Sequence, residues 1–126
     1  MTELRETVES YWAAAEARHW LAFGDTLAED VLFDLPQTRE RIRGRKRFVQ
    51  FNCEYPGDWH IRVHRLIADD ASGQVVTWSH ATVGFEQKYA VTFFTGDEEG
   101  RIASITEFWP EAYEPPPGRE HLVERY

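Results

Sequence analysis

The stretch Arg101-Ile-Ala-Ser-Ile-Thr-Glu-Phe-Trp-Pro110 predicts a late β-strand, which follows a glycine-flanked acidic turn at residues 96–100. Successive side chains of a strand point to opposite faces, so Glu107 shares its face with Ile105 and Trp109. An ionised carboxylate among apolar neighbours loses hydration, and such groups cluster at functional sites. We therefore expect this strand to line a small-molecule pocket.

Helical periodicity dominates the N-terminal part of the chain. A first helix is expected at about residues 3–18, because apolar side chains recur there on one stripe. This stripe consists of Leu4, Val8, Tyr11, Trp12 and Ala15. A short helix at residues 19–27 and a strand at residues 31–35, ended by Pro36, follow it, and a third helix is expected at about residues 45–55.

The rest of the domain predicts strands joined by short turns. They span residues 59–68, 74–83 and 89–95 and end with the stretch quoted above. Turns rich in glycine and aspartate separate them. This order of elements predicts an α+β fold, in which a curved antiparallel sheet holds three helices on its concave face.

Length and composition limit both architecture and partners. With 126 residues the chain builds one core, so we expect a domain at residues 1–112 and a proline-rich C-terminal arm at residues 113–126. The formal charge of −8 argues against binding to nucleic acid or to an anionic membrane. The single cysteine, Cys53, excludes an internal disulfide, and no secretory signal or membrane-spanning apolar run is present, so we expect a cytoplasmic protein.

A cluster of basic residues lies within residues 37–47, which hold Arg39, Arg41, Arg43, Arg45, Lys46 and Arg47. One interpretation is recognition of phosphate or carboxylate, assisted by the N-terminus of the third helix. The other is a solvated segment that pairs with the acidic surplus of the chain, which is the commoner role of such runs.

The chain resembles the nuclear transport factor 2-like superfamily and, within it, the SnoaL-like polyketide cyclase group. The resemblance covers residues 4–112 and rests on Asp25–Pro36, Gly44, Glu99–Ile102 and Thr106–Trp109 in this order and spacing. It implies a cone-shaped sheet whose open end admits a small hydrophobic molecule, and a homodimer formed through the sheet. The superfamily includes ketosteroid isomerases, scytalone dehydratase, limonene epoxide hydrolase and binding proteins, so membership leaves the reaction open.

The epoxide hydrolase branch provides a residue-by-residue comparison. The resemblance places Asp34 at a polar pocket position and Glu107 at a catalytic carboxylate. His80 and Thr82 fall where that branch has an arginine and a second catalytic aspartate. Because a threonine does not replace the missing acid, epoxide hydrolysis is not expected.

With epoxide hydrolysis set aside, the sequence still contains candidate residues for acid–base catalysis. Glu107, His80 and Asp34 are the candidate catalytic residues, since a histidine near a carboxylate in an apolar cavity supports proton transfer at neutral pH. The candidate ligand-binding residues are Tyr11, Trp12, Trp78, Thr82 and Trp109. In the isomerase branch a tyrosine of the first helix donates a hydrogen bond to the substrate oxygen, and Tyr11 is the residue here that resembles it.

Each candidate also has a structural interpretation. Glu107 could be held by a helix N-terminus, a tryptophan N–H or a tyrosine hydroxyl. Asp34 could cap the bend before Pro36, and His80 could be a hydrogen-bonded core residue. The tryptophans could belong to the core.

No metal or cofactor is expected. His60 and His64 have a spacing that suits a metal on a helix, but on a strand they lie roughly 13 Å apart. Cys53 is expected to pack as a small apolar residue. The sequence contains no glycine-rich phosphate loop, no nucleophile elbow and no cysteine pair for zinc.

Three functions follow from these observations. The first is a cofactor-independent isomerase, dehydratase or cyclase that acts on a small apolar carbonyl compound. The second is a ligand-binding protein without catalysis. The third is an interaction module that uses the exposed sheet face, with Phe108 and Val83 at a dimer seam.

Overall fold

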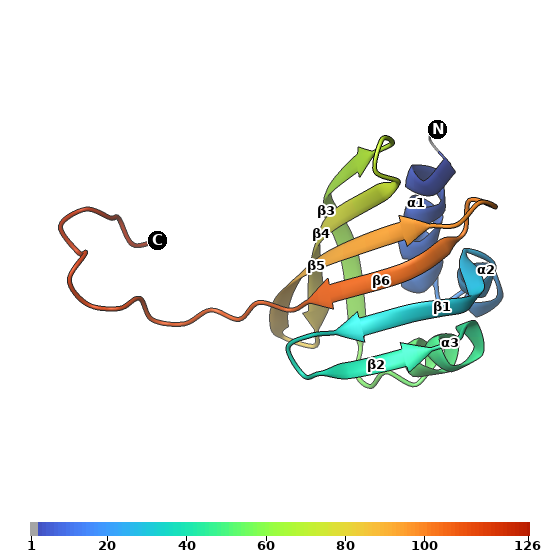
Figure 1. The fold of residues 1–126 in the computed structure, drawn as a ribbon. Helices are drawn as coiled ribbons and strands as arrows, with labels where there is room; N and C mark the ends of the chain where they lie inside the picture. Colours follow the sequence, from blue (N-terminus) through green and yellow to red (C-terminus); the bar gives the residue numbers. More distant parts are fainter. Residues whose placement is uncertain (1–2) are drawn as a thin grey trace.

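The computed structural model describes residues 3–126, and Figure 1 shows a curved sheet that wraps around the first helix. The α+β class, the curved sheet and the helices on its concave face agree with the sequence-based expectation. Within the described residues the elements are α1 (Glu3–Ala17), α2 (Trp20–Asp25), β1 (Leu27–Leu35), β2 (Glu40–Arg43), α3 (Arg45–Cys53), β3 (Trp59–Asp69), β4 (Gln74–Val83), β5 (Glu86–Gly96) and β6 (Ile102–Phe108).

The sheet is mixed, which corrects the expectation of a fully antiparallel one. Its strand order is β2-β1-β6-β5-β4-β3. β6 runs antiparallel to β5 but parallel to β1, with Phe33 opposite Ile105. The reason is topological: the last strand enters the sheet between β1 and β5, where it reverses the direction of β5 and so repeats that of β1. This position puts Glu107 near the middle of the sheet.

Part of the basic segment forms the edge strand β2, which the sequence analysis did not predict. β2 pairs with β1, and Ile42 lies opposite Phe33 and packs against the core. The flanking Arg41 and Arg43 are exposed. Charged side chains on an edge strand discourage pairing with other chains, so these arginines have a structural role in addition to their charge.

α1 fills the concavity of the sheet through its aromatic stripe. Tyr11 is the centre of this packing, with its ring centroid 4.7 Å from that of Phe23 and 5.2 Å from that of Phe94. Trp12 lies beside it and donates a hydrogen bond from Nε1 to Thr77 Oγ1 at 3.2 Å. The helix is therefore held to β4 and β5 by burial of aromatic surface and by one buried polar contact.

After β6 the chain leaves the domain. Residues 110–126 form an extended arm that points away from the sheet and turns back on itself (Figure 1). The rest of the described chain is packed around the single core. No helix among residues 3–126 has both the length and the apolar character needed to cross a bilayer.

Candidate functional site

A cavity of about 370 Å³ lies between α1, α3 and the concave face of the sheet. It is at the end of the sheet where β1, β4 and β6 finish and β3 and β5 begin. The other end of the concavity is closed by side chains such as Phe94 and Ile102, which are fully buried. The lining residues are Tyr11, Trp12, Ala15, Leu35, Thr38, Glu40, Phe51, Asn52, Tyr55, Trp59, Ile61, Ala81, Val83, Lys88, Glu107 and Trp109.

Glu107 projects from β6 into this cavity and is only 7% exposed. Thr92, its partner across the β5–β6 ladder, donates a hydrogen bond to Oε2 at 2.8 Å, and Trp109 Nε1 donates to Oε1 at 3.1 Å. Burial raises the pKa of Glu107 above its ordinary value of 4.5, although both hydrogen bonds oppose that rise. Each oxygen keeps a second acceptor position, so the carboxyl group retains hydrogen-bonding capacity toward the cavity.

Tyr11 places a hydroxyl group in the same cavity from the opposite layer. The ring is 3% exposed, and the hydroxyl has no hydrogen-bond partner among residues 3–126. Burial, and then the nearby Glu107 carboxylate, raise the pKa of Tyr11 well above its ordinary value of 10.0. Tyr11 therefore stays protonated at neutral pH and offers an unused O–H donor beside a carboxyl group.

Aromatic and aliphatic side chains form most of the remaining wall. Trp12 and Trp109 line the cavity, as the sequence predicted. Their indole N–H groups are engaged by Thr77 and Glu107, which fixes both rings. Space for a ligand arises because Ala81 on β4 and Ala15 on α1 lie where larger residues would fill the cavity.

His80, Trp78 and Thr82 do not reach the cavity, which corrects the expected placement of one candidate catalytic and two candidate ligand-binding residues. In β4 the neighbours Ser79 and Ala81 face inward, so the residues between them point to the outer face. The ring centroid of His80 lies 5.0 Å from that of Tyr89 on that outer face. The expected pairing of His80 with Glu107 is absent because the two side chains are on opposite faces of the sheet.

Asp34 is also on the outer face. Its neighbours Phe33 and Leu35 point inward and join the core. The Asp34 carboxylate accepts a hydrogen bond from Arg41 Nε, with 2.5 Å between Nε and Oδ1, across the β1–β2 pair. Neither the pocket interpretation nor the capping interpretation describes this residue, whose partner belongs to the unpredicted strand β2.

Several polar residues of the site were not predicted from the sequence. Thr92 is the most important: it is fully buried behind the cavity wall and bonds Glu107 directly. The alternation of Ala90, Thr92 and Phe94 placed it on one face of its strand, but only the register with β6 brings it to the carboxyl group. Asn52 and Lys88 are polar residues of the cavity wall itself.

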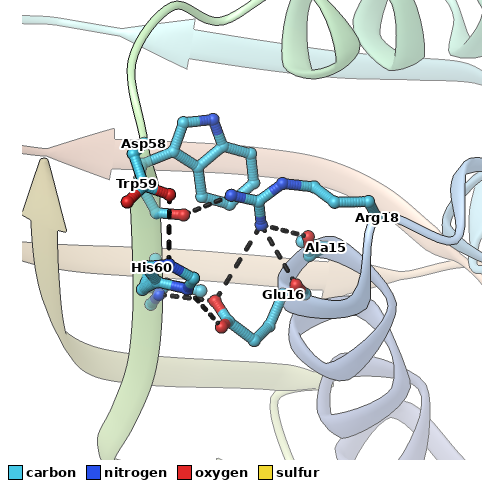
Figure 2. A network of polar contacts seen from close by, with 7 residues as sticks. Ala15, Glu16, Arg18, Asp58, Trp59 and His60 are labelled. Atoms are coloured by element: carbon cyan, nitrogen blue, oxygen red, sulfur yellow. Dashed lines mark hydrogen bonds and ion pairs between the residues drawn. The ribbon is translucent and has the colours of Figure 1, made fainter.

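A polar network at the end of α1 holds one wall of the cavity (Figure 2). The guanidinium of Arg18 lies 3.4 Å from the ring centroid of Trp59 and donates to the carbonyl oxygen of the same residue. Glu16 accepts hydrogen bonds from the backbone N–H of Ile61 and from His60, both at 2.8 Å. The bond to Glu16 raises the pKa of His60. These contacts fix the start of β3, and with it the cavity residues Trp59 and Ile61.

The described residues contain no group of three or more histidine, cysteine or acidic side chains placed to hold a metal ion. His60 is instead paired with Glu16 and Asp58. Cys53 is an exposed free thiol at the end of α3 and does not pack in the core, contrary to the expectation. The polar side chains that line the cavity carry carboxyl, hydroxyl, amide and ammonium groups.

Comparison with solved structures supports the fold and identifies structures that differ in their sequence identity to this chain. A crystal structure from Kribbella flavida DSM 17836, provisionally assigned as a ketosteroid isomerase, is 45% identical; the match covers 100% of this chain and 91% of that chain at a TM-score of 0.95. A provisionally assigned polyketide cyclase from Xanthomonas campestris is 22% identical, with 86% and 91% of the chains covered and a TM-score of 0.70.

A steroid delta-isomerase from Pseudomonas aeruginosa is 18% identical over 88% of this chain and 82% of that chain, with a TM-score of 0.72, and like the cyclase it shows a shared fold. Among curated proteins there is no match. The SnoaL-like domain model matches residues 8–121, which is most of the chain and includes part of the arm. The chain belongs to the SnoaL-like domain family.

Proposed function

We propose that this protein is a cofactor-independent acid–base enzyme that moves a proton at the carbon next to a carbonyl group in a small, largely apolar compound. One observation carries the proposal: a buried carboxyl group with a raised pKa and a tyrosine hydroxyl that has no hydrogen-bond partner among residues 3–126 face the same cavity. Perturbed titratable groups that converge in an apolar pocket are typical of proton-transfer sites.

The roles of the two groups follow from their chemistry. The substrate carbonyl oxygen accepts a hydrogen bond from the Tyr11 hydroxyl. The Glu107 carboxylate removes the α-proton, and its raised pKa makes it a stronger base than a solvated carboxylate. The charge then developing on the substrate oxygen is stabilised by Tyr11, which remains protonated because its own pKa is raised.

The fate of the enolate distinguishes the possible reactions. Return of the proton from Glu107 to a different carbon completes an isomerisation. Attack of the enolate carbon on a second carbonyl of the same substrate instead forms a ring, and the resulting alkoxide takes the proton back from Glu107. The family membership and the provisional assignment of the Kribbella flavida relative as a ketosteroid isomerase support this class of chemistry. A cavity of about 370 Å³ suits a ligand at the small end of the range for binding sites.

A second candidate function is ligand binding without catalysis. It is favoured by one observation: both carboxyl oxygens of Glu107 already accept hydrogen bonds from Thr92 and Trp109. In that case the carboxyl group would hold the cavity wall in place without moving a proton. The two candidates share the cavity and differ in whether a bound ketone exchanges its α-protons.

Exchange of α-protons with deuterated water tests the proposal without knowledge of the natural substrate. The probes are 2-tetralone, as a small bicyclic ketone, and a Δ5-3-ketosteroid, as a larger one. We expect the protein to accelerate loss of the α-proton NMR signal of at least one probe by about 10²-fold or more over buffer. Saturable binding of both probes without accelerated exchange would favour the binding protein.

We place the protein in the cytoplasm. Its only cysteine, Cys53, is exposed and free, which suits a reducing compartment.

A further inference from the structure

The C-terminal arm, residues 110–126, extends away from the sheet of its own domain (Figure 1). Among the described residues, its hydrogen bonds and its ion pair are all internal to the arm. Tyr113 is 86% exposed and Leu122 is 76% exposed. Exposed apolar side chains gathered on one segment are typical of a surface that contacts another protein.

The arm nevertheless has a defined shape. Arg125 pairs with Glu114 at 3.5 Å, and the backbone N–H of Gly118 donates to the Glu120 carboxylate at 3.1 Å. The Pro115–Pro117 run favours a stiff, extended backbone. Figure 1 shows the resulting hook standing clear of the sheet. The alignment with the Kribbella flavida structure covers the whole chain, so the arm belongs to the part that the two proteins share.

We propose that this arm docks on the outer, convex face of the sheet of a second copy of the chain, and that the two copies exchange arms reciprocally. The outer face here means the surface formed by Arg62, Arg65, Trp78, Tyr89, Phe93 and Phe108. A reciprocal exchange gives the same contact twice about a two-fold axis, as in most homodimers. This inference goes beyond the proposed reaction and does not depend on it.

Aromatic exposure on the outer face supports this assignment. Trp78 is 39% exposed, and Tyr89 and Phe93 are each 43% exposed. Phe93 packs edge-on against Phe108 at 6.3 Å between ring centroids. Since Phe108 ends β6, the arm begins next to this face, and the aromatic surface continues into the arm. Val83, expected at a dimer seam, lines the cavity instead.

Charge complementarity between the outer face and the arm supports a second copy of the chain as the molecule that covers this face. Arg62 and Arg65 are exposed, and neither has a carboxylate partner in the part of the chain that the structure describes. The guanidinium of Arg65 lies 5.7 Å from the ring centroid of Trp78. The start of the arm carries the exposed Glu111 close to Tyr113, whereas Glu114 is paired with Arg125 within the arm, so the arm presents an acid and an aromatic ring to a surface of arginines and aromatic rings.

A rival surface exists at the opposite end of the domain. An open groove of about 980 Å³ near the start of α3 is lined by Arg43, Arg45, Lys46 and Arg47 together with Trp20 and Leu21. It shares the basic and apolar character but is not continuous with the arm. We therefore assign the outer face as the docking surface and make the groove an outcome of the test.

Photocrosslinking of the full chain tests the exchange directly. The variant Tyr113→p-benzoylphenylalanine is prepared as a mixture of ¹⁴N-labelled and ¹⁵N-labelled protein and irradiated. We expect crosslinked peptides of mixed isotope that join residue 113 of one copy to residues 59–96 of another. Irradiation of a matched variant, Leu21→p-benzoylphenylalanine, should not give these products, because Leu21 is exposed away from the outer face.

A charge swap measured by sedimentation provides the second readout. We expect Arg62→Glu with Arg65→Glu to raise the dimer dissociation constant by about 10-fold or more, and Glu111→Lys, which leaves the Glu114–Arg125 pair of the arm intact, to restore part of the affinity in the combined variant. A monomeric wild-type chain would overturn the proposal. So would crosslinks within one copy only, crosslinks to the α3 groove, or a dimer whose arm forms no mixed-isotope product.

Discussion

Replacement of Glu107 by glutamine is expected to lower kcat/KM for α-proton exchange by about 10²- to 10⁴-fold, because the amide cannot accept the proton. The substitution keeps the size of the side chain; its carbonyl oxygen accepts the hydrogen bond from Trp109 Nε1, and its NH2 group donates to the Thr92 hydroxyl, which can act as an acceptor. Exchange is followed by NMR in deuterated water at saturating and at limiting concentrations of the ketone. The binding constant should change much less than the rate, since the cavity keeps its shape.

His80→Ala is the matched control for this result. The sequence makes His80 a candidate catalytic residue, but its ring lies on the outer face against Tyr89. We expect the rate of α-proton exchange catalysed by the His80→Ala variant to stay within about twofold of the wild-type rate, because changes at surface side chains have small effects. Full activity in Glu107→Gln, or a comparable loss in His80→Ala, would contradict the assigned roles.

Tyr11→Phe is expected to lower kcat by about 10²- to 10³-fold, the usual effect of removing one donor to a developing oxyanion. KM should change little, because the ring keeps its contacts with Phe23 and Phe94. Both constants are measured by the same exchange assay over a range of ketone concentrations.

The stability of the Tyr11→Phe variant separates a chemical role from a structural one. The Tyr11 hydroxyl has no hydrogen-bond partner among residues 3–126, so its removal should leave the free energy of unfolding within about 0.5 kcal/mol of the wild type. Val8→Ala, in a fully buried position on the same helix, is the comparison and should lose more than 1 kcal/mol. A large loss of stability in Tyr11→Phe with unchanged kcat would show that the hydroxyl is structural.

The site was predictable where a strand has one clearly apolar face. In β6 a single acid lies between Ile105 and Trp109, and alternation alone placed all three on the inner face, as the structure confirms. In β4 both faces carry apolar and polar residues. The resemblance to the epoxide hydrolase branch placed His80 and Thr82, and with them Trp78, on the inner face, but α1 fills that space with its own aromatic rings.

Small residues therefore mark the inner face of β4. Thr77 and Ser79 are fully buried because they lie under the helix, where Trp12 bonds Thr77. A sequence read strand by strand does not contain this information, since it arises from packing between distant elements. The strand β2 was not predicted for the same reason. Most of its residues are charged and exposed, and only Ile42 packs against the core.

The pH dependence of exchange, measured together with the ¹³C NMR titration of the Glu107 carboxyl group, tests the central claim most directly. Glu107 acts as a carboxylate, and burial raises its pKa above 4.5, so activity should be lost as the pH falls through that raised value. The acidic limb of kcat/KM and the carboxyl titration are predicted to coincide above pH 4.5, and Glu107→Gln should abolish the limb. A carboxyl group that titrates at or below 4.5, or an acidic limb that persists in Glu107→Gln, would contradict the account.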